Sequence, residues 1–130
     1  MEIIRNLIIT LVVFLGIDFI WLGLIAKNFY DQELSHFKRT LNLPVAFLDY
    51  FLIALGLVIF ILPKANGQPL QAFLWGAVFG LVAYGVYDLT NLATLADWTI
   101  KMTIVDMFWG ATVCGLVSFL VTLILSILKN

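Results

Sequence analysis

The chain has 130 residues, a formal net charge of −1, and 63% hydrophobic against only 12% charged residues. A soluble domain of this length exposes most of its residues and needs far more polar surface, so the composition indicates a membrane protein. The small net charge excludes the basic surface of a nucleic-acid-binding protein. The single cysteine, Cys114, excludes a disulfide within one chain.

Four apolar segments are long enough to cross about 30 Å of hydrocarbon, which takes roughly 20 helical residues. They cover about residues 6–26, 44–63, 70–96 and 99–128. Backbone polar groups must be hydrogen-bonded inside lipid, and segments of this length do not suit β-barrel strands. We therefore expect a single integral membrane domain over 1–130, an all-α four-helix transmembrane bundle built of antiparallel up-down hairpins.

The first connection, residues 27–44, is the longest. Tyr30, Leu34, Phe37 and Leu41 recur in it at helical spacing. This pattern predicts a short amphipathic helix at the membrane interface between the first two spans, or a continuation of the first span. We interpret the segment as an ordered connector that seals one end of the bundle.

The other two connections are shorter. Residues 63–69, PKANGQP, hold two prolines and Asn-Gly and predict a turn, and residues 95–99, LADWT, predict a tight hairpin between the last two spans. Four spans place both chain ends at one membrane surface, which we call face A. The connections 27–44 and 95–99 then lie at the opposite surface, face B.

Each apolar segment carries one aspartate, at positions 18, 49, 88 and 106. At the helical rise per residue, three of them fall roughly 10–12 Å below face B and Asp49 falls roughly 7 Å below it. An aspartate at the centre of a span costs about 2.5–3.5 kcal/mol on insertion scales. We therefore expect these side chains to face one another or water rather than lipid.

Aromatic and amide side chains share the helix faces of the aspartates. Tyr84 and Asn91 lie one turn before and after Asp88. The first and last spans both carry Asp-x-x-Trp, which places an indole N–H one turn from a carboxylate. The candidate ligand- or proton-binding residues are Asp88, Asp106, Asp18, Asn91, Tyr84, Trp109, Trp21 and Asp49.

No lysine or arginine lies at the depth of the aspartates, so we expect them to be hydrated, protonated or bound to a cation. Oxygen ligands suit hard cations, but the sequence specifies no metal or cofactor. The alternative is that the aspartates only join the helices, through hydrogen bonds worth about 0.6–2 kcal/mol each. For Asp49, near a helix start, we prefer this structural interpretation.

The segment GVYDLTNLATLADW followed by K.T.VD..WG (85–110), with DYFLIALG and the Asp-x-x-Trp of the first span, resembles an uncharacterised family of small bacterial predicted membrane proteins. That family is catalogued only as a domain of unknown function. The resemblance covers nearly the whole chain. It implies a four-span protein of the bacterial inner membrane, and it implies no catalytic residue.

The sequence thus predicts an acidic, aromatic-lined pocket near face B that binds or passes a cation, a proton or a small amphiphile in the lipid bilayer. Four helices leave little room for a pore, so transport would need a homo-oligomer or a partner. Two alternatives stay open. One is a membrane-embedded enzyme acting on lipids or isoprenoids, with Asp88 and Asp106 as acid and base. The other is a ligand-free scaffold or accessory subunit.

Overall fold

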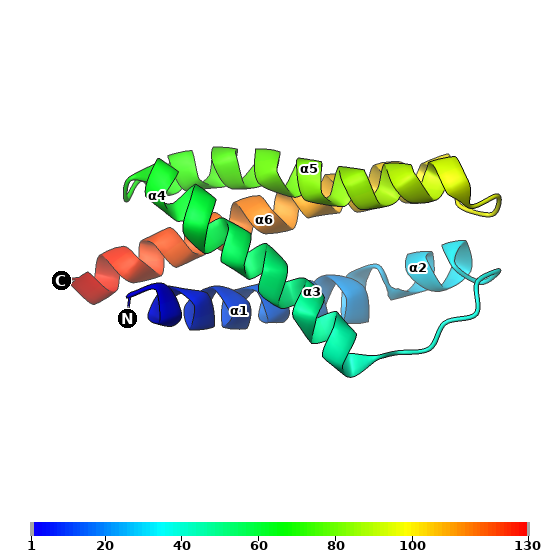
Figure 1. The fold of residues 1–130 in the computed structure, drawn as a ribbon, viewed down its shortest axis with the longest axis horizontal. Helices are drawn as coiled ribbons and strands as arrows, with labels where there is room; N and C mark the ends of the chain where they lie inside the picture. Colours follow the sequence, from blue (N-terminus) through cyan, green and yellow to red (C-terminus); the bar gives the residue numbers. More distant parts are fainter. Residues whose placement is uncertain (1, 130) are drawn as a thin grey trace.

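The structure is a computed structural model that describes residues 2–129, and within that range it contains helices and no strand. Four helical segments are long and apolar enough to cross a membrane. They are Glu2–Ile25, Leu43–Ala65, Pro69–Thr94 and Ile100–Lys129. The expected all-α, four-helix transmembrane architecture is confirmed (Figure 1).

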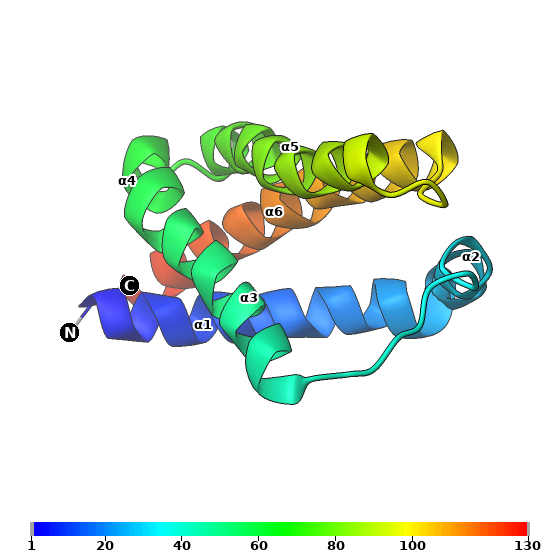
Figure 2. The ribbon, with the colours of Figure 1, turned by 45° about the vertical axis from the view of Figure 1, so that its right-hand side comes forward.

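The first segment ends in a widened turn. Helix α1 (Glu2–Ile20) continues into η1 (Trp21–Ile25), a π-helical turn in which the backbone N–H of Ala26 donates to the carbonyl of Trp21 at 2.7 Å. Helix α2 (Lys27–Glu33) follows at once and points away from the axis of α1 (Figure 2). The change of direction places α2 at face B, over the end of the bundle.

The second segment is divided into α3 (Leu43–Gly56), the π-helical turn η2 (Leu57–Ile61) and α4 (Leu62–Ala65). The widened turn directly precedes Pro63, which has no backbone N–H and whose ring clashes with the preceding turn of an α-helix. Asn66, with a φ of 52°, ends α4 in the left-handed conformation that the Asn-Gly pair predicts.

Helices α5 (Pro69–Thr94) and α6 (Ile100–Lys129) form an antiparallel hairpin with the most extensive helix contact of the bundle (Figure 1). Glycines on α5 allow the close approach. A Cβ atom on Gly80 would lie 2.0 Å from the carbonyl oxygen of Gly110, and one on Gly76 would lie 2.5 Å from Ser118 Oγ. The two backbones therefore meet over a surface that admits no side chain at these positions.

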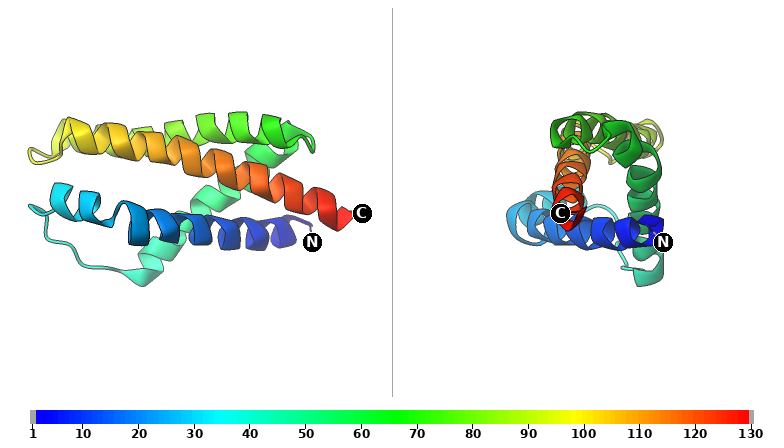
Figure 3. Two further views of the ribbon diagram at one scale, coloured as in Figure 1. Left: turned by 180° about the vertical axis from the view of Figure 1, so that it is seen from behind. Right: turned by 90° about the vertical axis from the view of Figure 1, so that its left-hand side faces the viewer.

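The apolar core lies between α1, η2 and α6, where Phe14, Leu57, Val113 and Val117 are buried. Helix α3 crosses the bundle obliquely and packs against α1, so that α4 and η2 rather than α3 make the contacts of this segment with α5 (Figures 1 and 3). Large apolar side chains cover the outside of all four segments. This distribution suits a lipid surrounding, in which apolar side chains need no burial.

The connector is helical over a shorter stretch than its pattern predicts. Helix α2 ends at Glu33, and Phe37 and Leu41 lie in non-helical chain. The Ser35 hydroxyl donates to the backbone carbonyl of Gln32 at 2.8 Å, a local bond that competes with continuation of the helix.

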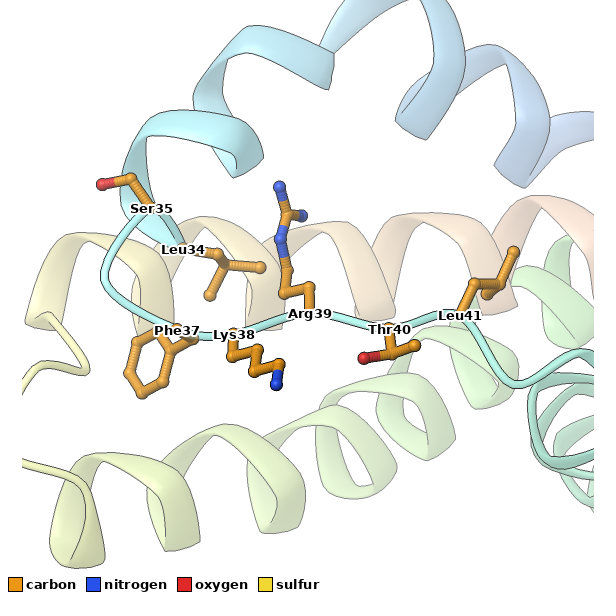
Figure 4. A pocket seen from close by; sticks show the side chains of 7 residues that line it. All are labelled: Leu34, Ser35, Phe37, Lys38, Arg39, Thr40 and Leu41. Carbon is orange, nitrogen blue, oxygen red and sulfur yellow. The ribbon is translucent and has the colours of Figure 1, made fainter.

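An ionic clip holds the non-helical part of the connector to α2. Figure 4 shows the Arg39 side chain directed toward α2, and its Nη2 lies 3.0 Å from Asp31 Oδ1. Lys27 Nζ lies 2.8 Å from Asp31 Oδ2. Hydrogen bonds from Lys27 and Arg39 lower the pKa of Asp31, which keeps the clip charged at neutral pH.

Gly80→Ala is expected to destabilise the bundle by about 1–3 kcal/mol, because its methyl group would meet backbone atoms of α6 that have no room to move. The control is Gly16→Ala, since nothing lies within 4 Å of a Cβ atom at position 16. That substitution should be neutral or should stabilise the helix by up to about 1 kcal/mol. Free energies of unfolding from denaturant titration in mixed micelles will distinguish the two, and equal values would contradict the close contact.

Candidate functional site

Asp18 on α1 is buried, with 4% of its surface exposed, and both of its carboxylate oxygens accept a hydrogen bond. The indole Nε1 of Trp109 on α6 donates to Oδ1 at 2.9 Å, and the hydroxyl of Tyr50 on α3 donates to Oδ2. One carboxylate therefore joins three helices, and each of its oxygens has the hydrogen-bond donor that a buried acceptor needs.

Asp106 on α6 is also buried and is connected to the first site through aromatic rings. The Tyr30 hydroxyl donates to Asp106 Oδ1 at 2.7 Å and accepts a hydrogen bond from Trp21 Nε1 at 3.1 Å. Trp21 stacks on Trp109, with ring centroids 4.4 Å apart and an interplanar angle of 10°. Because Trp109 donates to Asp18, the stacked indoles link the two carboxylates.

The Asp-x-x-Trp spacing places each indole one turn from the aspartate of its own helix, but neither indole donates to that aspartate. Trp109 donates to Asp18 across the bundle, and Trp21 donates to Tyr30. The stack explains the exchange, since parallel rings from α6 and η1 direct each N–H toward a group on a different element. The spacing within one helix could not show this arrangement, because it depends on how two helices meet.

Tyr30 and Tyr50 are the functional candidates that our sequence reasoning missed. Tyr30 belongs to the apolar stripe of the connector, so its pattern predicted only interfacial packing. In the structure Tyr30 is buried. This burial and, to a smaller extent, the neighbouring charge of Asp106 raise the pKa of Tyr30 well above its ordinary value. Its hydroxyl thus stays protonated and available as a donor. Tyr50 is adjacent to Asp49, and no sequence signal distinguished it.

Asp88 on α5 is fully buried, and neither of its oxygens has a hydrogen-bond partner among residues 2–129. The ring of Tyr84 on α5 packs against Gly110 on α6. Because the two helices are antiparallel, Asp88, one turn after Tyr84, lies opposite Asp106, one turn before Gly110. This register places the two buried carboxyl groups on facing sides of α5 and α6. Two ionised carboxylates offer only acceptors, whereas a single proton between them would supply the missing donor.

A cavity of about 460 Å³ lies between α1, α3, α5 and α6, where α3 diverges from α5 (Figure 1). Its wall includes three carboxylates, three tyrosines and one tryptophan, and no lysine or arginine. The lining residues are Asp18, Leu22, Val45, Ala46, Asp49, Tyr50, Ile53, Ala83, Tyr84, Tyr87, Asp106 and Trp109.

The cavity unites some of the eight candidate residues and leaves others behind its wall. Five of them line it, namely Asp18, Asp49, Tyr84, Asp106 and Trp109. Asp88, Asn91 and Trp21 do not line it. Asp49 lines the cavity from α3 but is exposed, whereas Asp18, Asp88 and Asp106 are buried. Asp49 lies close to the start of α3, in the part of that helix that is separated from α5.

The residues of this site do not form a metal-binding cluster. Within residues 2–129, no three histidine, cysteine, aspartate or glutamate side chains are grouped so that they could hold a metal ion.

Comparison with known proteins identifies a family without an assigned activity. A family model described as predicted membrane protein (DUF2177) matches residues 3–123, which is most of the chain. The resemblance expected from the sequence to a family of predicted membrane proteins is confirmed. No curated protein and no solved structure matched the chain.

Tyr50→Phe is expected to destabilise the bundle by about 0.6–2 kcal/mol, because it removes the donor from a buried carboxylate oxygen of Asp18. The matched control is Tyr87→Phe, which removes the same atom from an exposed tyrosine of the cavity wall. Unfolding free energies in mixed micelles will compare them. Equal losses would contradict the tie between α1 and α3.

Proposed function

Because the chain belongs to the predicted membrane protein family DUF2177 and its four helices can span a bilayer, we propose that the cavity beside α5 binds the cationic end of a small amphiphile. The observation that carries this proposal is the wall itself. Three carboxylates and four aromatic rings converge on one cavity whose lining contains no basic residue.

The charges of the wall favour a cation over an anion or a neutral molecule. Asp18 already accepts two hydrogen bonds, so its charge acts mainly through space. Asp106 accepts one from Tyr30, and Asp49 is exposed at the wall where an entering ligand meets it first. Field lines concentrate in a cleft with apolar surroundings, which strengthens the attraction for positive charge.

The aromatic side chains favour an organic cation over an inorganic one. The rings of Tyr50, Tyr84, Tyr87 and Trp109 line the same space as the carboxylates. A quaternary or primary ammonium is attracted to the face of such a ring, by about 0.5–2 kcal/mol for each good contact. An organic ammonium can satisfy the carboxylates and the rings together, whereas a metal ion lacks a ligand cluster among the described residues.

The position of α3 supports an amphiphile rather than a fully polar ligand. Val45, Ala46 and Ile53 of α3 and Ala83 of α5 are the apolar part of the wall. Val45 is also exposed, as is Val86 of α5, which does not line the cavity. A ligand whose charged end occupies the cavity can therefore leave its apolar part between α3 and α5, in the bilayer. Passage across the whole membrane would in addition need a second copy of the chain.

The enzyme alternative has less support from the geometry. In that alternative Asp88 and Asp106 would act as acid and base, and both carboxyl groups would have to contact the substrate. Asp88 is fully buried and does not line the cavity. The scaffold alternative predicts that no ligand binds, so a binding experiment separates it from the proposed function.

Asp49→Asn is expected to weaken binding of dodecyltrimethylammonium roughly fivefold, from the loss of about 1 kcal/mol of charge attraction near the surface. Quenching of tryptophan fluorescence in a neutral detergent measures this binding, since Trp109 lines the cavity. Dodecyl sulfate, with the same alkyl chain and the opposite charge, should not produce saturable quenching.

The matched control for this experiment is Asp97→Asn, which removes an equal charge from an exposed position in the turn between α5 and α6, outside the cavity wall. It should leave the affinity unchanged. Equal weakening in both variants would show that only the net charge matters. Absence of saturable binding by the unmodified protein would favour the scaffold alternative.

Proton binding by the pair Asp88 and Asp106 is a second candidate function, and it is favoured because residues 2–129 provide no donor to Asp88. A buried pair of carboxylates is most stable with one shared proton, because like charges close together cannot both remain ionised at low cost. Asp106 belongs both to the pair and to the cavity wall, and Asp88 lies behind that wall. Arrival of a cation at Asp106 would then compete with the proton.

Infrared spectroscopy of the protein in liposomes is expected to show the carbonyl stretch of a protonated carboxylic acid at neutral pH. The band should be absent in Asp88→Asn, where the amide supplies a permanent donor to Asp106 in place of the shared proton. Asp97→Asn is again the control and should retain the band. A spectrum of the unmodified protein without this band would contradict proton binding by the pair and leave cation binding untouched.

A further inference from the structure

A second hollow lies at the opposite end of the bundle, at face A, and takes no part in the cavity described above. It is a groove of about 650 Å³ between the first turns of α1, the η2–α4 segment and the last turns of α6. Figure 3 shows these three elements meeting at the end of the molecule where both chain ends lie. The groove is thus placed at a membrane surface.

The polar end of the groove is positively charged. Arg5 and Lys129 line it, against a single carboxylate from Glu2. Within the described part of the chain, both ion pairs involve Asp31 at the other face, so neither of these two cations has a carboxylate partner. Arg5 donates only to the amide oxygen of Asn6, at 3.2 Å. Its guanidinium and the ammonium of Lys129 remain available to an anion.

Most of the remaining lining of the groove is apolar, and Asn6, Thr122 and Ser126 are its polar members. Its walls include Ile3 of α1, Val58 and Ile59 of η2, and Leu62 and Leu125 from the neighbouring elements. Ile3 and Ile59 are exposed, at 58% and 46% of their surfaces, and so continue the apolar outer surface of the bundle. A molecule that fits this gradient has an anionic group at the surface and an apolar chain beneath it.

We propose that this groove is a binding site for a phospholipid with an anionic headgroup. Its phosphate contacts Arg5 and Lys129, and one acyl chain lies along the apolar wall formed by Ile59, Leu62 and Leu125. The two cations and one carboxylate give the groove a net positive charge, which attracts a lipid headgroup of net negative charge. Arginine suits this role, since its planar guanidinium presents paired donors to phosphate oxygens.

The test is native mass spectrometry of the purified full chain with phosphatidylglycerol, phosphatidylethanolamine and phosphatidylcholine of identical acyl chains. Phosphatidylglycerol should be retained preferentially. Lys129→Gln and Arg5→Gln should each lower its retention roughly fivefold, from the contribution of one basic side chain near a charged lipid. Lys129→Gln is the safer variant for folding, because this lysine is exposed in the last turn of α6.

The matched control is Lys64→Gln, which removes the same charge at the same membrane face. Lys64 lies outside the groove, with its ammonium 4.2 Å from the centroid of the Trp75 ring. Retention of phosphatidylglycerol should not change in this variant. Equal retention of the three lipids, an equal effect of Lys64→Gln, or displacement of the lipid by millimolar inorganic phosphate would each overturn the proposal. The last result would identify a site for free phosphate instead.

Discussion

A carboxylate removed from water inside an apolar bundle needs hydrogen-bond donors, and this requirement organises the half of the molecule nearest face B. Asp18 obtains its donors from Tyr50 on α3 and Trp109 on α6, so three helices are joined at one side chain. Trp109 in turn supports the stacked Trp21, which donates to Tyr30. The chain of contacts ends at Asp106. Helix α2, outside the membrane spans, is thereby held over the bundle by a buried hydroxyl.

At the glycine contact between α5 and α6, close packing leaves Asp88 without such donors among the described residues. Where Gly80 meets Gly110 the backbones approach too closely for side chains, and Asp88 follows two turns later on the same face. It is fully buried and has no donor within reach among the described residues. Close packing therefore creates an unsatisfied acid directly behind a satisfied one. The environment of Asp88 thus differs from that of Asp18, where each carboxylate oxygen accepts a hydrogen bond.

The two ends of the bundle carry complementary chemistry. Near face B, carboxylates and aromatic rings surround a cavity, and at face A a groove is bordered by two cations that have no carboxylate partner among the described residues. Between them the helices are packed by small and branched residues such as Gly76, Val113 and Val117. The oblique path of α3 opens the cavity, and the π-helical turn at Pro63 precedes the change to α4 beside the groove.

The sequence by itself determined the four helical segments, their connections and the presence of one acid in each, because length and hydropathy decide what can cross a bilayer. It also predicted Asp18, Asp106 and Trp109 as candidate binding residues, and these three line one cavity in the structure. Only the tertiary structure decided that Trp109 serves Asp18, that Tyr30 reaches Asp106, and that Asp49 is exposed. Helical spacing specifies which side chains share a face of one helix, whereas partners on different helices depend on crossing angle and separation, which packing between the helices sets.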